Sequence, residues 1–90
     1  MLTNIRNLKS ALENIVEPNF GLLDHLLSLE VLTRPQLAHV RSKKTVYTRN
    51  EAMLDLLVTE DQCCGFLKAL QQTDQQHVIN FIEANGGLKH

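Results

Sequence analysis

The chain has 90 residues, enough for one small domain but too few for a second hydrophobic core or a large substrate cleft, which excludes most multi-step enzymes. Hydrophobic residues make up 43% of the chain, with only three phenylalanines, one tyrosine and no tryptophan, a composition that favours a leucine-rich helical core over an aromatic-rich β-sandwich. Nine basic and ten acidic side chains leave a net charge of −1, so bulk charge indicates neither nucleic acid nor an anionic membrane as the partner.

Apolar residues recur at helical spacing in six stretches, which predicts six helices. In chain order the stripes fall within residues 5–16, 23–27, 37–40, 54–58, 63–70 and 78–82. Pro18 separates the first two helices, because proline disfavours a helical conformation at the residue before it. No strand-like alternation of useful length is present, and the short connections bring all six stripes into one core. The sequence therefore predicts an all-α bundle.

A capping-box pattern marks four of the expected helix starts, since threonine is followed three residues later by glutamate or glutamine. The four boxes are Thr33 with Gln36, Thr48 with Glu51, Thr59 with Gln62 and Thr73 with Gln76. At the other end, Asn85-Gly86 is expected to stop the last helix in the left-handed conformation. We expect a single domain over residues 1–85, with residues 86–90 as a C-terminal tail or the start of a linker.

Chemistry-bearing residues are sparse. Cys63 and Cys64 are adjacent and close no useful disulfide loop, and the four histidines show no metal-ligand spacing, so neither a metal nor a cofactor is predicted. A thiol enzyme built on Cys64 and His77 is a minor alternative, because neighbouring acids disfavour the thiolate of Cys64. No signal-peptide pattern and no apolar run of about 18 residues is present, which predicts a soluble, cytoplasmic protein.

Four segments resemble, in this order and spacing, the caspase recruitment domain family. They are residues 21–33, a leucine-rich helix that leads into Val-Leu-Thr, and residues 40–45, 49–57 and 66–78. The resemblance covers roughly residues 5–85. It implies a six-helix antiparallel bundle of the death-fold superfamily in a Greek-key arrangement, whose first helix is bent or broken. Asn7 and Ser10 are the candidate positions for that break, because both residues are weak helix formers.

The resemblance also implies a function without catalysis: binding another recruitment domain, in a caspase, adaptor or sensor, within an apoptotic or inflammatory and innate-immune signalling complex. In the family, a basic surface on the first and fourth helices meets an acidic surface on the second and third helices of another domain. Carried over to this chain, Arg6 or Lys9 supplies the first helix and Arg49 the fourth helix of the basic side, and Asp24 and Glu30 belong to the acidic side. The third-helix acids are absent here, because residues 34–39 contain none.

Charge is also clustered along the chain, although its sum is near zero. Residues 31–50 contain five bases and no acid, and residues 51–61 contain four acids and no base, which predicts opposed charged faces. We expect a basic interaction surface made of Arg6, Lys9, Arg41, Lys43, Lys44 and Arg49. We expect an acidic interaction surface made of Asp24, Glu30, Asp55, Glu60 and Asp61. Asymmetric contacts between such faces predict possible self-association into helical oligomers.

Other interpretations of these residues remain open. The basic segment 34–49 is also an alternative nucleic-acid-binding element, although Lys43 and Lys44 are expected in a turn and no base-reading array lies along one helix face. Tyr47 is expected to pack as a staple on the fourth helix, with an exposed aromatic contact as the alternative. The stretch Val58-Thr-Glu-Asp61 replaces the family's frequent Lys-Gly turn, so we expect a short, tightly capped connection there.

Overall fold

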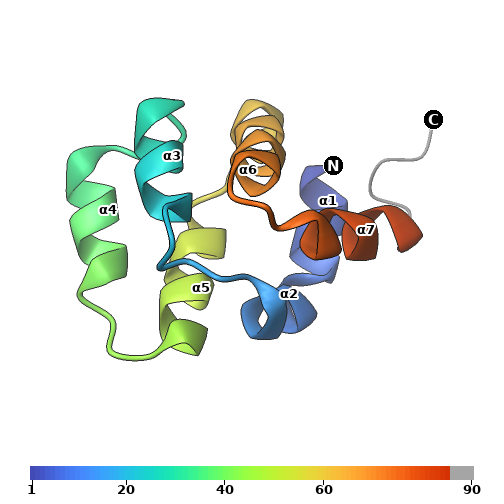
Figure 1. Cartoon of the computed structure of the whole chain (residues 1–90), viewed down its shortest axis with the longest axis horizontal. Coiled ribbons are helices and arrows are strands. Elements are labelled where there is room, and N and C mark those ends of the chain that lie inside the picture. The colour runs from blue at the N-terminus through green and yellow to red at the C-terminus, as the bar shows by residue number, and fades with distance from the viewer. Residues whose placement is uncertain (86–90) are drawn as a thin grey trace.

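The computed structural model describes residues 1–85 and shows, within that range, an all-helical bundle with no strand (Figure 1). It has seven helices: α1 (Leu2–Asn7), α2 (Lys9–Ile15), α3 (Leu22–Ser28), α4 (Arg34–Arg41), α5 (Val46–Asp55), α6 (Glu60–Gln72) and α7 (Gln76–Ala84). The helices α3 and α4 lie at one end of the bundle and α1 and α7 at the other, with α5 and α6 between them. The expected stop at Gly86 and the expected tail lie outside the described residues.

The seventh helix arises because the expected first helix is broken in two. α1 ends at Asn7 and α2 begins at Lys9, and Leu8 between them adopts φ −95° and ψ 2°. The amide of Leu8 still donates to the carbonyl of Asn4 at 3.0 Å, so the chain bends without uncoiling. The predicted break is therefore confirmed at Asn7, a weak helix former. The other candidate position, Ser10, lies inside α2.

Two of the four predicted capping boxes, at Thr33 and Thr59, are present as expected. The box predicted at Thr48 is wrong by one turn, because α5 begins at Val46 and its N-cap is Thr45. The Thr45 hydroxyl accepts from the amide of Thr48 at 3.1 Å, and the Thr48 hydroxyl accepts from the amide of Thr45 at 3.2 Å. Thr48 thus plays the reciprocal role that glutamate or glutamine usually plays in a capping box.

The box predicted at Thr73 is also wrong, because Thr73 ends α6 instead of starting α7. Its hydroxyl donates back to the carbonyl of Ala69 at 2.8 Å. The next residue, Asp74, has φ 59°, and the amide of Gln75 donates to the carbonyl of Leu70 at 2.9 Å, which makes the turn a Schellman motif. This motif uses up the residues that would have capped the following helix, so α7 begins at Gln76 without a side-chain cap.

The core is a single apolar cluster to which every helix contributes. Phe66 of α6 is its largest fully buried side chain, and α2 packs closely along α5. Cys63 is a fully buried core residue, as its position on the α6 stripe predicts, and Cys64 is exposed. One member of the predicted stripes fails: Val58 is 54% exposed, because α5 ends at Asp55 and the chain turns before it reaches Val58.

Candidate protein-interaction surfaces

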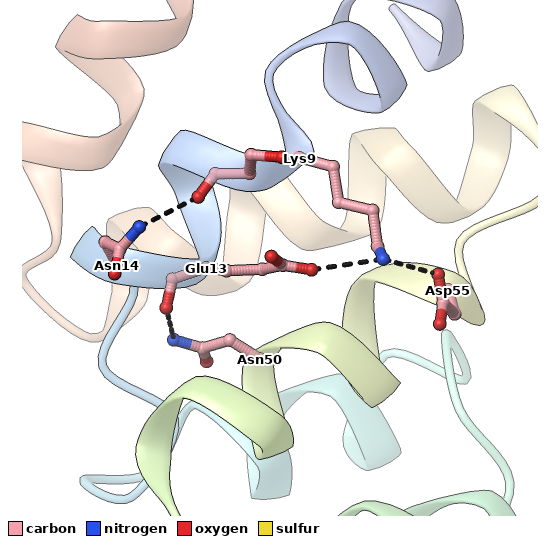
Figure 2. Close-up of polar contacts among 6 residues, drawn as sticks. Lys9, Glu13, Asn14, Asn50 and Asp55 are labelled. Carbon is pink, nitrogen blue, oxygen red and sulfur yellow. Dashed lines mark hydrogen bonds and ion pairs between the residues drawn. The ribbon is translucent and has the colours of Figure 1, made fainter.

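Lys9, expected on the basic surface, forms an ion-pair bridge between α2 and α5. Its Nζ lies 3.1 Å from the Glu13 carboxylate one turn along α2 and 2.9 Å from the Asp55 carboxylate on α5 (Figure 2). The hydrogen bond to Asp55, and to a smaller extent the one to Glu13, raises the pKa of Lys9 above its usual range. Asp55 was expected on the acidic surface, so the structure brings together two residues that the charge pattern assigns to opposite surfaces.

A second pair also joins the two expected surfaces. The Arg41 guanidinium at the end of α4 donates to the Asp24 carboxylate on α3 at 2.5 Å. Both side chains are largely exposed, at 49% and 70%, so the pair contributes only about 0–1 kcal/mol to folding. Asp24 is therefore an acid that already has a basic partner on its own molecule.

Arg49 on α5 is a further residue of the expected basic surface. Its side chain bonds to the α4–α5 connection and to the α2–α3 connection. Its Nε donates to the carbonyl of Lys43 at 2.8 Å, and Nη1 donates to the side chain of Asn19 at 2.7 Å. A longer bond of 3.4 Å reaches the carbonyl of Arg41. Within the segment 34–49, Arg41 and Arg49 are thus both engaged internally, which weakens the nucleic-acid interpretation of that segment.

The side chains of three of the expected basic residues have no hydrogen-bonding or ionic partner among residues 1–85. Arg6 is exposed on α1, and Lys43 and Lys44 lie in the connection between α4 and α5, as predicted. That connection is short and is closed by the Thr45 cap, so it has a defined conformation. These three side chains are the part of the expected basic surface that is available to a partner.

The remaining expected acids lie near the start of α6. The Glu60 carboxylate accepts from the amide of Leu2 at 2.8 Å and pairs with the terminal amine of Met1 at 3.2 Å. The hydrogen bond from the Leu2 amide, and to a smaller extent the contact with the terminal amine, lowers the pKa of Glu60. Glu30, with φ 60°, and Asp61 are exposed and have no such partner within the described chain. A bond of 3.2 Å from the Gln62 side chain to the carbonyl of Val31 brings their two segments together.

Two surface grooves accompany these charges. The first, here called the α1–α5 groove, has a volume of about 310 Å³ and is lined by Ile5, Arg6, Lys9, Leu54, Asp55 and Leu57. The second, between α3 and α4, has a volume of about 580 Å³ and is lined by Asp24, Leu27, Arg34, Leu37, Ala38, Arg41 and Ser42. Each groove has an apolar floor and a charged rim, an arrangement typical of protein-contact surfaces.

Sequence reasoning missed two buried polar residues, Glu13 on α2 and Asn50 on α5. Glu13 is only 3% exposed, and Asn50 is fully buried and donates to the carbonyl of Glu13 at 3.1 Å (Figure 2) and to that of Val16 at 2.7 Å. Tyr47 is not a staple: it lies inside α5, is 46% exposed, and its hydrogen bond with Glu13 raises the pKa of its hydroxyl. The four-residue spacing of Lys9 and Glu13 was the sequence signal that could have predicted their ion pair on one helix face.

The part of the chain that the structure describes contains no set of His, Cys, Asp and Glu side chains that could hold a metal ion. Burial raises the pKa of Cys63, which is consistent with an inert core thiol. The ring of His77 lies 3.1 Å from the carbonyl of Ile15, so one of its nitrogens is engaged at the end of α2. Among the same residues, no helix has the length and apolar character needed to cross a membrane.

These features define a death-fold helical bundle whose accessible surface offers charged side chains and shallow grooves. The chain belongs to the family of the caspase recruitment domain, whose family model matches residues 2–85. No curated protein and no solved structure matches it. Family membership makes it a module for homotypic protein–protein interaction, of the kind used in apoptotic and inflammatory signalling, in a family that is not catalytic.

Proposed function

We propose that this domain recruits another caspase recruitment domain into an apoptotic or inflammatory signalling complex in the cytoplasm through charge-complementary, asymmetric contacts. The observation that carries the proposal is the division of the basic surface into two groups. Lys9, Arg41 and Arg49 are held by internal partners, whereas the three remaining bases are without one within residues 1–85. These available bases are Arg6, Lys43 and Lys44.

The internally held bases support the available ones. Arg49 fixes the backbone of Lys43 and so positions the connection that carries both lysines. Lys9 and its carboxylate partners hold α2 against α5, next to Arg6 on α1. A preorganised charged surface binds with a smaller loss of conformational entropy than a flexible one. Its charges mainly increase the association rate and select the partner, and only part of their effect is on affinity.

The complementary acids on this chain are Glu30 and Asp61, which lie near the junction of α3 and α6. Asp24 contributes less, since Arg41 already neutralises it. A basic surface that meets an acidic surface of a different kind gives a heterologous contact, which does not close on itself and can extend into a helical or ring assembly. Repeated weak contacts then add through multivalency.

A pull-down with purified recruitment domains of caspases, adaptors and sensors tests the proposal at low and high salt. The double variant Lys43→Glu/Lys44→Glu should lower binding at least tenfold at low salt and flatten its salt dependence, because two attractive charges become repulsive. The matched control is Lys68→Glu, an exposed charge reversal on α6 outside the basic surface. Equal binding by folded control and double variant would remove these lysines from the mechanism.

A further inference from the structure

A further surface pocket lies where the α2–α3 connection passes the end of α4 and the first half of α5 (Figure 1). Its volume is about 170 Å³, and its polar side chains belong to Asn19, Asp24, Arg41 and Arg49. Two guanidinium groups therefore meet a single carboxylate there. This pocket, here called the Arg41–Arg49 pocket, has an excess of positive charge.

Arg49 is a half-buried cation that has no anionic partner among residues 1–85. Its guanidinium donates only to neutral oxygens: the carbonyl of Lys43 at 2.8 Å, the side chain of Asn19 at 2.7 Å and the carbonyl of Arg41 at 3.4 Å. These bonds hold the side chain in place but leave its charge uncompensated. Because a guanidinium has five N–H donors, two of those on Arg49 remain for a ligand.

Arg41 brings the second guanidinium to the same pocket. It contacts the Asp24 carboxylate through Nη2, and its other N–H groups have no partner within the described chain. The Asp24 side chain is 70% exposed, so it can turn into water and release Arg41 at little cost. Glu17, the other acid near this connection, accepts from the amide of Asn19 at 3.0 Å and does not line the pocket.

The donors of the pocket come from three separate elements, which favours a tetrahedral anion. Arg41 belongs to α4 and Arg49 to α5, and the Asn19 side chain on the α2–α3 connection keeps its NH₂ group, since only its oxygen is bonded to Arg49. A phosphate accepts from several directions, whereas a planar carboxylate accepts mainly along one edge. The pocket volume is roughly six times the liquid volume of a water molecule, which is room for one phosphate group.

We propose that the Arg41–Arg49 pocket binds a phosphate group, either as the free ion or as a phosphate monoester. Arg49 holds the phosphate through its remaining N–H groups, and Arg41 turns from Asp24 toward it. A monoester carries close to two negative charges at neutral pH, which match the two guanidiniums. The pocket is shallow and small, so the free ion binds in the millimolar range. This site uses neither the Lys43 nor the Lys44 side chain and does not depend on the proposed function.

NMR titrations of the ¹⁵N-labelled chain with inorganic phosphate, O-phosphoserine and acetate, at equal ionic strength and pH, test the site. Phosphate or O-phosphoserine should give saturable shifts at the Asn19 side-chain amide, the Gly21 amide and the Arg49 Nε–H. Saturation by the first probe identifies the free ion as a ligand, and saturation by the second identifies the monoester. Equal saturation by acetate, or shifts that grow linearly with every salt, would overturn the phosphate site.

Two pairs of variants with equal net charge separate the pocket from general attraction of an anion to the protein. Asp24→Asn should tighten phosphate binding about threefold, because it removes the competing acid. Its control is Glu83→Gln, an exposed acid on α7 at the other end of the bundle. Arg41→Gln should weaken binding at least tenfold, because it removes charged donors, and its control is Lys68→Gln on α6.

Arg41 and Asp24 are both exposed, so their substitution should leave the thermal unfolding midpoint near that of the controls. Equal phosphate affinity of Arg41→Gln and Lys68→Gln, or of Asp24→Asn and Glu83→Gln, would overturn the pocket. Neither result decides whether Lys43 and Lys44 bind a recruitment domain, which the pull-down measures separately.

Discussion

The Lys9 ammonium lies 2.9 Å from the Asp55 carboxylate and so joins α2 to α5. The same ammonium compensates the Glu13 carboxylate, whose side chain is only 4% exposed. Charge at Lys9 therefore has a structural use as well as any use in binding. A charge reversal there changes the fold and the surface together, which is why Arg6, Lys43 and Lys44 are the better positions for a binding test.

The first prediction concerns this bridge. Lys9→Met should lower the free energy of unfolding by about 1–3 kcal/mol, because it leaves the buried Glu13 carboxylate without its cation. The double variant Lys9→Met/Glu13→Gln should recover part of that loss, since the second change removes the uncompensated charge. Urea unfolding followed by circular dichroism measures both. The bridge would be unimportant if Lys9→Met stayed within about 0.5 kcal/mol of wild type, the range expected for a surface change such as Lys68→Met.

The second prediction concerns Asn50, which is fully buried on α5 and fastens the end of α2. Its amide donates to the carbonyls of Val16 and Glu13, where the chain leaves α2. Asn50→Ala should cost about 1–3 kcal/mol of stability, since it leaves two buried acceptors without their donor. Hydrogen exchange should speed up most in α2. Uniform acceleration across all helices would instead show that Asn50 contributes only to global packing.

The third prediction is a loss of stability at alkaline pH. Lys9 and Tyr47 both have a raised pKa in the folded state, through hydrogen bonds to Asp55 and Glu13 respectively. A group whose pKa is raised by folding contributes stability that is present below its unfolded pKa and lost as the pH rises through the folded one. The free energy of unfolding should therefore fall above about pH 10, where free tyrosine and lysine begin to titrate.

Tyr47→Phe separates the two contributions to this alkaline loss. The variant removes the hydroxyl that titrates beside Glu13, so its stability should depend less steeply on pH above about pH 10. The residual slope belongs to Lys9 and to the buried Cys63 thiol, whose pKa folding also raises, and the Lys9 part should be lost in Lys9→Met. Thermal unfolding midpoints measured from neutral to alkaline pH provide the readout. Superimposable profiles for wild type and Tyr47→Phe would show that the Tyr47 hydroxyl is not coupled to folding.

The fold was largely predictable from sequence because its signals are local. Helical spacing of apolar residues, the Pro18 breaker and the boxes at Thr33 and Thr59 act within a few residues of chain. The two misplaced boxes show the limit of such signals. In the box that begins at Thr45, Thr48 occupies the position where glutamate or glutamine is usual. At Thr73 the preceding helix ends in a Schellman motif that competes for the same residues.

The candidate surfaces were predictable only in part, because the partners of a charge are set by tertiary structure. Lys43, half-buried, and Lys44, exposed, lie in the connection between α4 and α5, as their place after a short helix predicts. The contact of Asp24 with Arg41, seventeen positions away, depends on how α3 packs against α4. Likewise, no local pattern shows that Val58 falls past the end of α5. Counting charges along the chain therefore overestimates how far the basic and acidic surfaces are separated.

The last prediction concerns Gly65 on α6, where the helix passes close to the connection between α3 and α4. A Cβ atom added at Gly65 would lie 2.3 Å from Cγ2 of Val31, a contact that the short, branched valine side chain cannot relieve by moving its tip away. Gly65→Ala improves helix propensity by about 1 kcal/mol. Overpacking of this kind costs about 1–3 kcal/mol, so the net effect should be destabilising.

Adding Val31→Ala removes the clash, and the double variant should be more stable than the sum of the two single changes by at least about 0.5 kcal/mol. Strict additivity in urea unfolding would mean that the backbone of α6 shifts to accommodate the new methyl group without involving Val31.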